Sequence, residues 1–394
     1  MARFLYAWEL GGNLGHVGAF APVAGRLQHA GHDIHLVVRD TRACALLPGA
    51  RCDWSQAPHC DAPPGPAAPL SYADILAGVG YLDCATLMGL LVAWRTQLTL
   101  TRPDLVFADH APTAILAART LGIPVMLFGS GFTAPPPCSP FPPMRHWEAL
   151  EPAALAALGA RERRVLGTIN DVLTTLHVPL LVHLCDLFDV AENALLTVPE
   201  LDHYRHRPAA RYWGLPCNPP AAAVSWPPGA GPRIYAYLRH ERALTTAIIA
   251  AIGHLTASSI VFCPDWTDAM GCARGMTIVT RPVALTALAR EADIAIANGA
   301  STIGAFLMAG KPVLSLAIHL EHYLSGLRVM QLGAGLVLRA DGPFDALAPA
   351  LARLHTDGSY TEQARAFATR YADLHGDAVI AALCERALAL ALHH

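Results

Sequence analysis

Short apolar segments alternate with helical patterns along the first half of the chain. An apolar segment over residues 4–8 precedes a helix whose apolar positions recur every three or four residues until Gly31. A second helix is predicted over residues 114–121. Such alternation is typical of a parallel sheet with helices on both faces. Further strands are predicted over residues 34–38, 104–108, 124–128 and 194–198.

A proline-rich segment separates this half from a second one of the same kind. Eight prolines lie between residues 199 and 233, which is typical of a linker. After the linker the alternation restarts, with a helix over 244–255 and an Ala-rich helical tail over 361–392. Strands are predicted over residues 234–238, 259–263, 276–279, 294–297 and 313–317.

The pattern therefore predicts an α/β fold of two doubly wound, Rossmann-like domains. We expect them to face each other across a cleft, where the carboxyl ends of both sheets meet, and ligands bind at that end of such sheets. The tail either simply packs or returns to brace the first domain. The expected division is a first domain over 1–215, a linker over 216–232, a second domain over 233–375 and a C-terminal helix over 376–394.

Composition excludes several classes of protein. With 53% apolar and 15% charged residues the chain is not disordered, and a net charge of −3 argues against nucleic acid as a partner. The longest apolar runs, such as residues 85–94, are well short of a membrane span of about 20 residues. We find no secretion signal and expect a cytoplasmic protein, for which a peripheral membrane contact remains open. The ten cysteines are scattered without a CxxC pair, which favours ordinary thiols over a metal site or disulfides.

Two loops of the first half carry candidate chemistry. The loop after the first strand contains three glycines and ends at His16, which opens the following helix. A lone histidine at a helix start is more often a surface or capping residue than a catalyst. However, Asp109 directly follows the strand predicted over 104–108, at the same edge of the predicted sheet. Its carboxylate can bind one imidazole nitrogen and leave the other as a base, although Asp109 can also cap the helix over 114–121.

The second half has a candidate anion site. The strand over 294–297 runs into Asn298, Gly299, Ala300, Ser301 and Thr302 before a helix begins. Small and hydroxyl residues at such a turn expose backbone N–H groups at the positive end of the helix, where a diphosphate can bind. Thr302 can equally serve only as a helix cap.

Landmarks along the whole chain resemble the bacterial macrolide-type glycosyltransferases, which are UDP-glucuronosyltransferase-like enzymes of GT-B fold. They occur in the family's order and comprise Gly15-His16-Val17, Tyr212-Trp213-Gly214, Gly299 to Thr302, Gly310-Lys311-Pro312, Glu321-His322 and Gly333-Ala334-Gly335. The resemblance implies an inverting, metal-independent transfer of a sugar from a nucleotide donor to an acceptor hydroxyl. It also implies that the acceptor binds in the first domain and the donor in the second.

The same resemblance implies roles for individual residues. His16 stands where the family has its general base, and Asp109 where it has the carboxylate that orients this base. Glu321 and His322 match the pair that binds the donor sugar, with His322 in place of glutamine. Two further departures are Ala297, in place of a histidine that contacts the diphosphate, and Ala305, in place of a glutamate that holds the ribose.

Arg239 offers a compensation for the missing histidine. It follows the first strand of the donor domain, where its guanidinium can bind a diphosphate, although a solvated arginine fits the pattern equally well. The donor half has no DxD pair, so we expect no metal, and the expected donor is a UDP- or dTDP-sugar. In the resembled enzymes the acceptor pocket is walled by regions that here contain Tyr72, Tyr81, Leu82, Trp94, Phe132 and Phe141, which favours a hydrophobic small-molecule or lipid acceptor.

Two other functions fit the same fold. A non-catalytic GT-B protein with a decayed donor site is the main alternative, and Ala297 and Ala305 are the evidence for it. A sugar-nucleotide epimerase requires additional acidic residues at the donor's anomeric centre, and we find none. The presence of both His16 and Asp109 favours the transferase.

Overall fold

The computed structural model describes residues 1–12, 15–46, 52–61, 69–204, 207–208, 210–215, 221–238, 242–255, 257–267, 272 and 274–392. The chain forms two compact units. Unit 1 comprises Met1–Val198, Asp202–Gly214 and Val379–His394, and unit 2 comprises Pro199–Leu201 and Leu215–Ala378.

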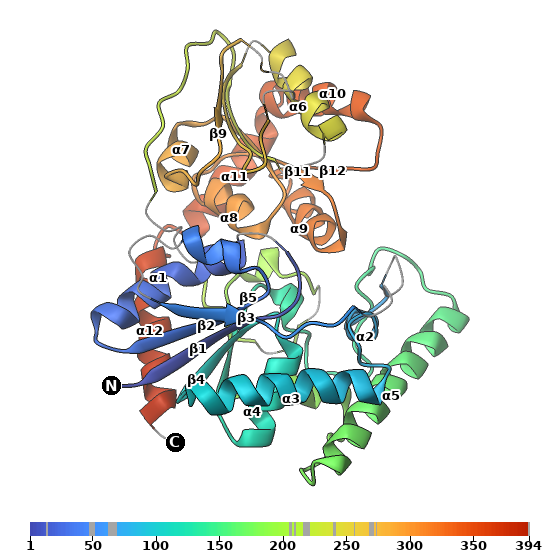
Figure 1. Cartoon of the computed structure of the whole chain (residues 1–394). Coiled ribbons are helices and arrows are strands. Elements are labelled where there is room, and N and C mark those ends of the chain that lie inside the picture. The colour runs from blue at the N-terminus through green and yellow to red at the C-terminus, as the bar shows by residue number, and fades with distance from the viewer. Residues whose placement is uncertain are drawn as a thin grey trace. The chain divides into compact units, whose positions relative to one another are not determined.

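Unit 1 is built on a six-stranded parallel sheet with the order β3-β2-β1-β4-β5-β6 (Figure 1). The order reverses between β1 and β4, which makes the carboxyl ends of these two strands the topological switch point. Rings from β1, β4, β5 and the helix that follows β1 fill the core; Tyr6 of β1 stacks on Phe20 of that helix with ring centroids 4.3 Å apart. The strands are β1 (Arg3–Trp8), β2 (Asp33–Val38), β3 (Asp53–Gln56), β4 (Leu105–Asp109), β5 (Val125–Gly129) and β6 (Glu192–Leu195).

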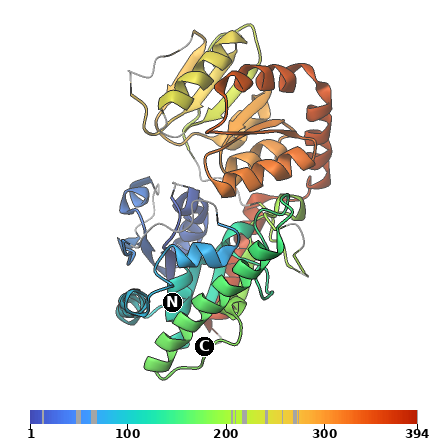
Figure 2. The same ribbon diagram turned by 90° about the vertical axis from the view of Figure 1, so that its right-hand side faces the viewer.

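Helices cover both faces of this sheet. The helices are α1 (Gly15–His29), α2 (Tyr72–Ala77), α3 (Cys84–Thr101), α4 (Pro112–Leu121), α5 (Pro152–Thr175) and α12 (Gly376–Leu392). Helix α3 packs against α4 and α5, and Figure 2 shows α5 extended along unit 1. The C-terminal α12 lies beside α1, where Cys384 Sγ donates to the Val23 carbonyl at 3.9 Å. Arg386 of α12 also pairs with Glu192 of β6 at 2.7 Å.

Unit 2 repeats the same topology. Its six-stranded parallel sheet has the order β12-β11-β10-β7-β8-β9, so its switch point lies between β7 and β10. Helices α6 and α10 pack together over one core, and α8 contacts α7 and α11. The strands are β7 (Arg233–Tyr237), β8 (Ser258–Phe262), β9 (Met276–Val279), β10 (Ile294–Ala297), β11 (Val313–Ala317) and β12 (Gly335–Arg339). The helices are α6 (Arg242–His254), α7 (Leu285–Glu291), α8 (Ala300–Met308), α9 (Leu320–Gln331), α10 (Leu347–Thr356) and α11 (Gly358–Arg370).

The structure differs from the sequence prediction in the tail and at the edges of the sheets. Edge strands β3 and β12 were not predicted; β3 has the sequence DWSQ, which contains no apolar run. The helical tail expected over 361–392 is divided into α11 and α12, and α12 corresponds to the C-terminal helix expected over 376–394; the Tyr371 hydroxyl between them donates to Glu200. Glu200 lies in the short 3-10 helix Pro199–Leu201, which packs with unit 2 although the first domain was expected to run to residue 215.

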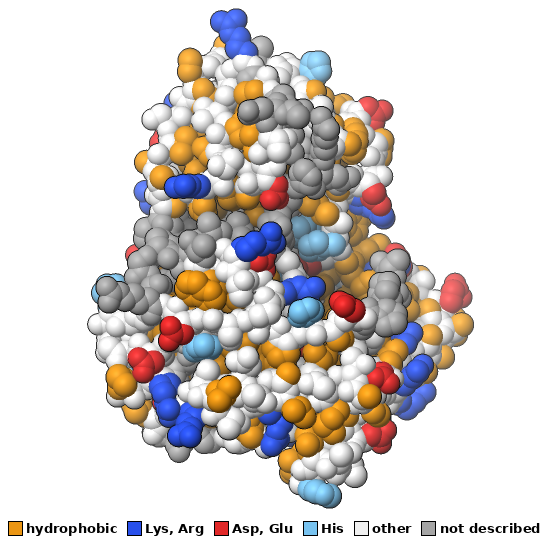
Figure 3. All heavy atoms as spheres, in the orientation of Figure 1, with side chains coloured by type: hydrophobic (Ala, Val, Ile, Leu, Met, Phe, Trp, Pro, Cys, Tyr) orange, Lys and Arg blue, Asp and Glu red, His pale blue; other side chains and the backbone are white. Residues whose placement is uncertain are grey.

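The surface is mixed in character. Acidic, basic and hydrophobic side chains are interspersed over the described part of the face shown in Figure 3, rather than gathered in one basic block. Among the described residues, no helix combines the length and hydropathy needed to cross a membrane.

Candidate active site

The switch point of unit 1 brings together the two loops that the sequence analysis singled out. Strands β1 and β4 are parallel neighbours, and their last residues, Trp8 and Asp109, lie opposite each other. The chain after β1 leads to helix α1, which begins at Gly15 and carries His16 in its first turn. Segments separated by about a hundred residues in sequence therefore meet at one edge of the sheet.

His16 and Asp109 form a hydrogen-bonded pair at this edge. His16 Nδ1 lies 2.9 Å from Asp109 Oδ2, and their side chains are 17% and 5% exposed. The Tyr6 hydroxyl donates to the same carboxylate oxygen at 2.8 Å. Burial, and then the charge of Asp109, raise the pKa of Tyr6 well above its usual range, so this hydroxyl remains a donor. The carboxylate is thus held from β1 while it binds the imidazole.

Trp8 and Gly11 fix the other sides of the His16 ring. The Trp8 indole stacks on the imidazole with centroids 4.9 Å apart, and its Nε1 donates to the Leu10 carbonyl at 2.8 Å. Gly11 adopts a φ of +81°, and a Cβ added there would lie 3.1 Å from His16 Nε2. Both the backbone conformation and the limited space therefore favour glycine at this position. With Nδ1 directed at Asp109, Nε2 is the nitrogen placed to accept a proton.

Asp109 is not a helix cap, contrary to the alternative considered from the sequence. Helix α4 begins at Pro112 with Ala111 as its N-cap, and the carboxylate at its amino end belongs to Glu9. Glu9 Oε2 accepts a hydrogen bond from the Thr113 backbone N–H at 2.9 Å. The Asp109 carboxylate is consequently available to bind His16.

Two buried titratable groups beside the pair were not identified from the sequence. Burial raises the pKa of Glu9 to about 7, although the hydrogen bonds from the amino end of α4 act to lower it. Burial also lowers the pKa of His110 to about 3, and the nearby His16 contributes to the lowering. His110 directly follows β4 and adopts a φ of +48°. No sequence pattern marks either residue, because their burial depends on how the two loops pack.

The aromatic residues expected to wall an acceptor pocket lie in unit 1. Tyr72, Tyr81, Trp94, Phe132 and Phe141 are buried, and Leu82 is partly exposed. The Tyr72 ring contacts those of Phe141 and Phe188 at centroid distances of 6.1 and 5.3 Å. Phe132 lies in the loop after β5, edge-on to the His110 ring at 6.0 Å. The structure therefore connects this aromatic group to the His16 and Asp109 loops through His110.

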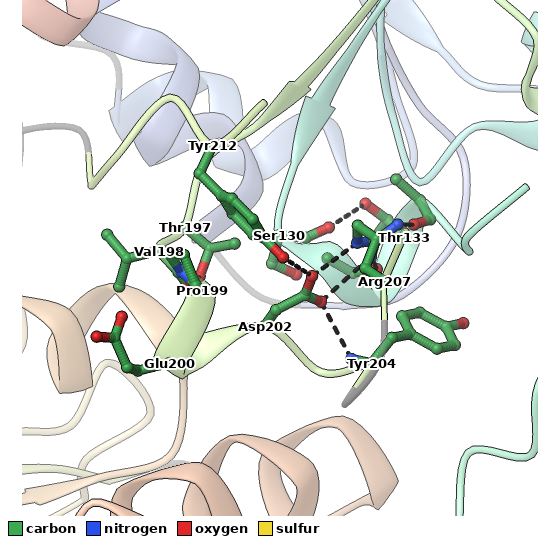
Figure 4. Close-up of polar contacts among 12 residues, drawn as sticks. Ser130, Thr133, Thr197, Val198, Pro199, Glu200, Asp202, Tyr204, Arg207 and Tyr212 are labelled. Carbon is green, nitrogen blue, oxygen red and sulfur yellow. Dashed lines mark hydrogen bonds and ion pairs between the residues drawn. The ribbon is translucent and has the colours of Figure 1, made fainter. Parts of the chain in front are cut away.

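A buried ion pair holds the Phe132 loop in place, and it was missed in the sequence analysis. Arg207 Nε lies 2.6 Å from Asp202 Oδ2, and the side chains are 2% and 1% exposed. Figure 4 shows Asp202 surrounded by Arg207, the Tyr212 hydroxyl and the Tyr204 backbone N–H. Arg207 also donates to the carbonyls of Gly131 and Ala134 at 3.1 and 2.7 Å.

The loop accommodates this pair because residue 131 is glycine. A Cβ on Gly131 would lie 2.2 Å from Asp202 Oδ1. Burial alone would raise the pKa of Asp202, but the hydrogen bonds and charge of Arg207 lower it below its usual value. The pair thus stays ionised and ties the segment after β6 to the loop after β5.

In unit 2 the predicted donor residues lie at the carboxyl ends of two adjacent strands. Asn298 and Gly299 follow β10, Gly299 is the N-cap of α8, and Ala300 begins that helix. Asn298 is 3% exposed, and its Oδ1 has no hydrogen-bond partner among the described residues. Ser301 is exposed and Thr302 buried in the first turn. The amino end of α8 thus offers backbone N–H groups and an amide side chain.

Glu321 and His322 lie in the first turn of α9, which follows the neighbouring strand β11. His322 is buried, and its ring lies 3.7 Å from that of His319, the N-cap of α9. Ala297 ends β10 fully buried, and Ala305 is partly buried within α8. Arg239 lies outside the described residues. Within the described ranges, no three His, Cys, Asp or Glu side chains are grouped so that they could hold a metal ion.

Comparison with solved structures gives full-length matches. Glycosyltransferase SnogD from Streptomyces nogalater is 20% identical with a TM-score of 0.63, covering 99% of both chains. Glycosyltransferase VinC, solved in complex with DTDP, is 17% identical with a TM-score of 0.64 over 100% of both chains. The spinosyn rhamnosyltransferase SpnG, complexed with spinosyn aglycone, is 15% identical with a TM-score of 0.68, covering 97% of this chain and 100% of SpnG.

The chain has the GT-B fold. Its two six-stranded parallel sheets correspond to the two Rossmann-like domains of these proteins, as the sequence analysis predicted. No protein-family model matches the chain. No curated protein matches it by sequence either. At these identities the structural likeness establishes the fold, and the function has to be argued from the site.

Proposed function

We propose that the protein is a glycosyltransferase that moves a sugar from a UDP- or dTDP-sugar to a hydroxyl of a hydrophobic small-molecule or lipid acceptor. The hydrogen bond between His16 Nδ1 and Asp109 Oδ2 is the observation that carries the proposal. Orientation by a buried carboxylate equips a histidine to act as a general base, and here the histidine lies at the ligand-binding edge of a Rossmann-like sheet.

The proposed reaction is a single displacement with inversion at the anomeric carbon. His16 Nε2 takes the proton of the acceptor hydroxyl as its oxygen attacks the anomeric carbon and the bond to the diphosphate breaks. Asp109 stabilises the imidazolium that forms, and Tyr6 keeps the carboxylate in position. General-base catalysis of this kind typically contributes about 10² to 10⁴ in rate.

Unit 2 is the proposed donor-binding unit. The backbone N–H groups at the amino end of α8, with Asn298 and Ser301, would offset the charge of the leaving diphosphate without a metal ion. Arg239 is proposed to add a positive charge there. Glu321 and His322 at the start of α9 are proposed to bind the sugar hydroxyls. Binding of DTDP by VinC and of spinosyn aglycone by SpnG, proteins of the same fold, supports these ligand classes.

Calorimetry and a transfer assay test the proposal in two steps. UDP and dTDP are titrated into the protein with EDTA and again with magnesium, and we expect at least one to bind equally in both. Release of nucleoside diphosphate is then followed with hydrophobic phenols as acceptors. His16→Ala should keep nucleotide affinity within a few fold and lose at least tenfold in kcat. A variant with wild-type kcat would exclude His16 as the base.

Two positions of the proposed donor site have alanine where the resembled enzymes have polar side chains, and this favours a second candidate function. The side chains of Ala297 and Ala305 offer no hydrogen bond to a diphosphate or ribose. A non-catalytic binding protein of this fold would retain unit 1 as a ligand site and bind no nucleotide. Absence of binding to UDP, dTDP and GDP in the same titrations would select this alternative.

A further inference from the structure

His110 lies beside the catalytic pair but takes no part in its hydrogen bonds. Its backbone carbonyl accepts from the Leu10 N–H at 2.9 Å, which joins the chain after β4 to the chain after β1. Its φ of +48° is uncommon for a residue with a Cβ and costs roughly 1 kcal/mol. The surrounding contacts impose this conformation, and it positions the imidazole at the switch point.

The imidazole of His110 is buried and incompletely bonded. The residue is 8% exposed, and Nε2 has no hydrogen-bond partner among the described residues. Its ring neighbours are aromatic, with the Tyr72 and Phe132 centroids each 6.0 Å away. The Tyr72 hydroxyl also has no hydrogen-bond partner in the described part of the chain. A buried polar atom without a partner is unfavourable, so Nε2 would gain from a hydrogen bond to a bound ligand.

The His110 and His16 rings both lie beside Gly11. A Cβ on this exposed glycine would lie 3.3 Å from His110 Nδ1 and 3.1 Å from His16 Nε2. Both imidazoles therefore lie against Gly11, His16 with its Nε2 and His110 with its Nδ1. The two rings are therefore neighbours, and an acceptor that reaches His16 also comes near His110.

The two histidines differ in chemistry. Burial holds the pKa of His110 near 3, so it is a poor base at neutral pH. A neutral imidazole nevertheless offers one N–H donor and one nitrogen acceptor. His110 is thus suited to bind a hydroxyl or carbonyl group rather than to remove a proton.

We propose that His110 binds the acceptor, forming a hydrogen bond to a second oxygen adjacent to the hydroxyl that His16 deprotonates. The inference rests on the proposed function and narrows its substrate class. The preferred acceptor is then a hydrophobic molecule with two neighbouring oxygen groups, such as a vicinal diol or a hydroxyl beside a carbonyl. His110 selects which hydroxyl is presented to the base.

Two coumarins that differ by one hydroxyl provide the probes. 4-Methylumbelliferone has a single phenolic hydroxyl, and 4-methylesculetin has a second one beside it. In calorimetric titrations the wild-type protein should bind 4-methylesculetin about threefold to tenfold more tightly, which corresponds to one additional hydrogen bond. The His110→Phe variant should bind the two coumarins equally.

Two further variants separate recognition from folding. His110→Asn keeps a hydrogen-bonding side chain that tolerates a positive φ, so it should fold like the wild type and retain part of the preference. His177→Phe is the matched control, because His177 also has a positive φ, at +54°, but is exposed at the end of α5. It should leave the preference unchanged.

Different results of these titrations would contradict the role of His110 or the proposed function itself. Equal affinity of the wild type for both coumarins, or an unchanged preference in His110→Phe, would overturn the role of His110. Binding of UDP or dTDP without measurable binding of either coumarin at millimolar concentration would also overturn it, while the proposed function would stand. Absence of nucleotide binding would instead remove the proposed function itself.

Discussion

The Glu9 carboxylate accepts a hydrogen bond from the Thr113 backbone N–H at 2.9 Å, although the two residues are 104 positions apart in sequence. The contact ties the chain after β1 to the amino end of α4. Asp109 and His110 lie immediately before this helix, and Trp8, which stacks on His16, lies immediately before Glu9. Glu9 therefore stabilises the arrangement of both loops that form the candidate site.

Protonation of Glu9 should make stability depend on pH. Its pKa is raised from 4.5 to about 7 by burial, so the folded protein binds a proton that the unfolded chain has released between these values. The stabilisation that this proton provides is complete below pH 4.5 and is lost as the pH rises toward 7. The expected loss is roughly 3 kcal/mol, from about 1.4 kcal/mol per pKa unit.

The Glu9→Gln variant removes this titration. Its free energy of unfolding, measured with denaturant between pH 4.5 and 8, should rise relative to wild type by up to roughly 3 kcal/mol across that range. His110 is present in both proteins. Its lowered pKa makes both of them lose stability as the pH falls below 6.5, and this effect cancels in the difference. A difference independent of pH would show that Glu9 does not bind the proton.

Gly11→Ala should impair catalysis more than the same substitution at the neighbouring Gly12 does. The added methyl would lie 3.1 Å from His16 Nε2 and 3.3 Å from His110 Nδ1, at a φ of +81°. We expect kcat to fall at least tenfold and stability by roughly 1 kcal/mol. Gly12→Ala is the control, since nothing lies within 4 Å of its Cβ. Similar kcat values for the two variants would contradict the proposed geometry.

The Asp202 and Arg207 pair should be strongly coupled. Arg207→Met leaves a buried carboxylate without its partner and should cost about 3 to 5 kcal/mol in free energy of unfolding. The double variant Asp202→Leu with Arg207→Met should lose at least 1 kcal/mol less than the sum of the single losses. Arg339→Met, which breaks the exposed pair with Asp341, should leave the unfolding midpoint unchanged. Simple additivity of the buried variants would argue against the coupling.

Arg239→Ala should weaken binding of nucleoside diphosphate by about tenfold to a hundredfold, since a charge-assisted hydrogen bond to phosphate contributes about 1.5 to 3 kcal/mol. Free nucleoside should bind the variant and wild type alike in calorimetry. Arg233→Ala, at the opposite end of β7, is the matched control and should change neither affinity. Equal loss for both ligands would indicate misfolding, and no loss would place Arg239 away from the phosphates.

The sequence alone determined the fold class, and it singled out His16 and Asp109, which the structure brings into contact. Strands buried in a parallel sheet are apolar runs, and helices that cover it have a 3.6-residue period, so both are visible in the sequence. The predictions over 276–279, 294–297 and 313–317 coincide with β9, β10 and β11. His16 and Asp109 were found because each closely follows a predicted strand, and parallel strands end at one edge. Strand β3 was missed because an exposed edge strand needs no apolar run.

Only the tertiary structure decided what surrounds that pair. The sequence allowed Asp109 to be a helix cap, a partner of His16 or both, and in the folded chain Glu9 binds the amino end of the helix while Asp109 binds His16. The burial of Glu9 and His110, and the contact of Asp202 with Arg207, depend on loops that pack side by side although they are distant in sequence. Desolvation and hydrogen bonding act through space, so no periodicity records them. The proximity of His110 to His16 therefore appears only in the folded chain.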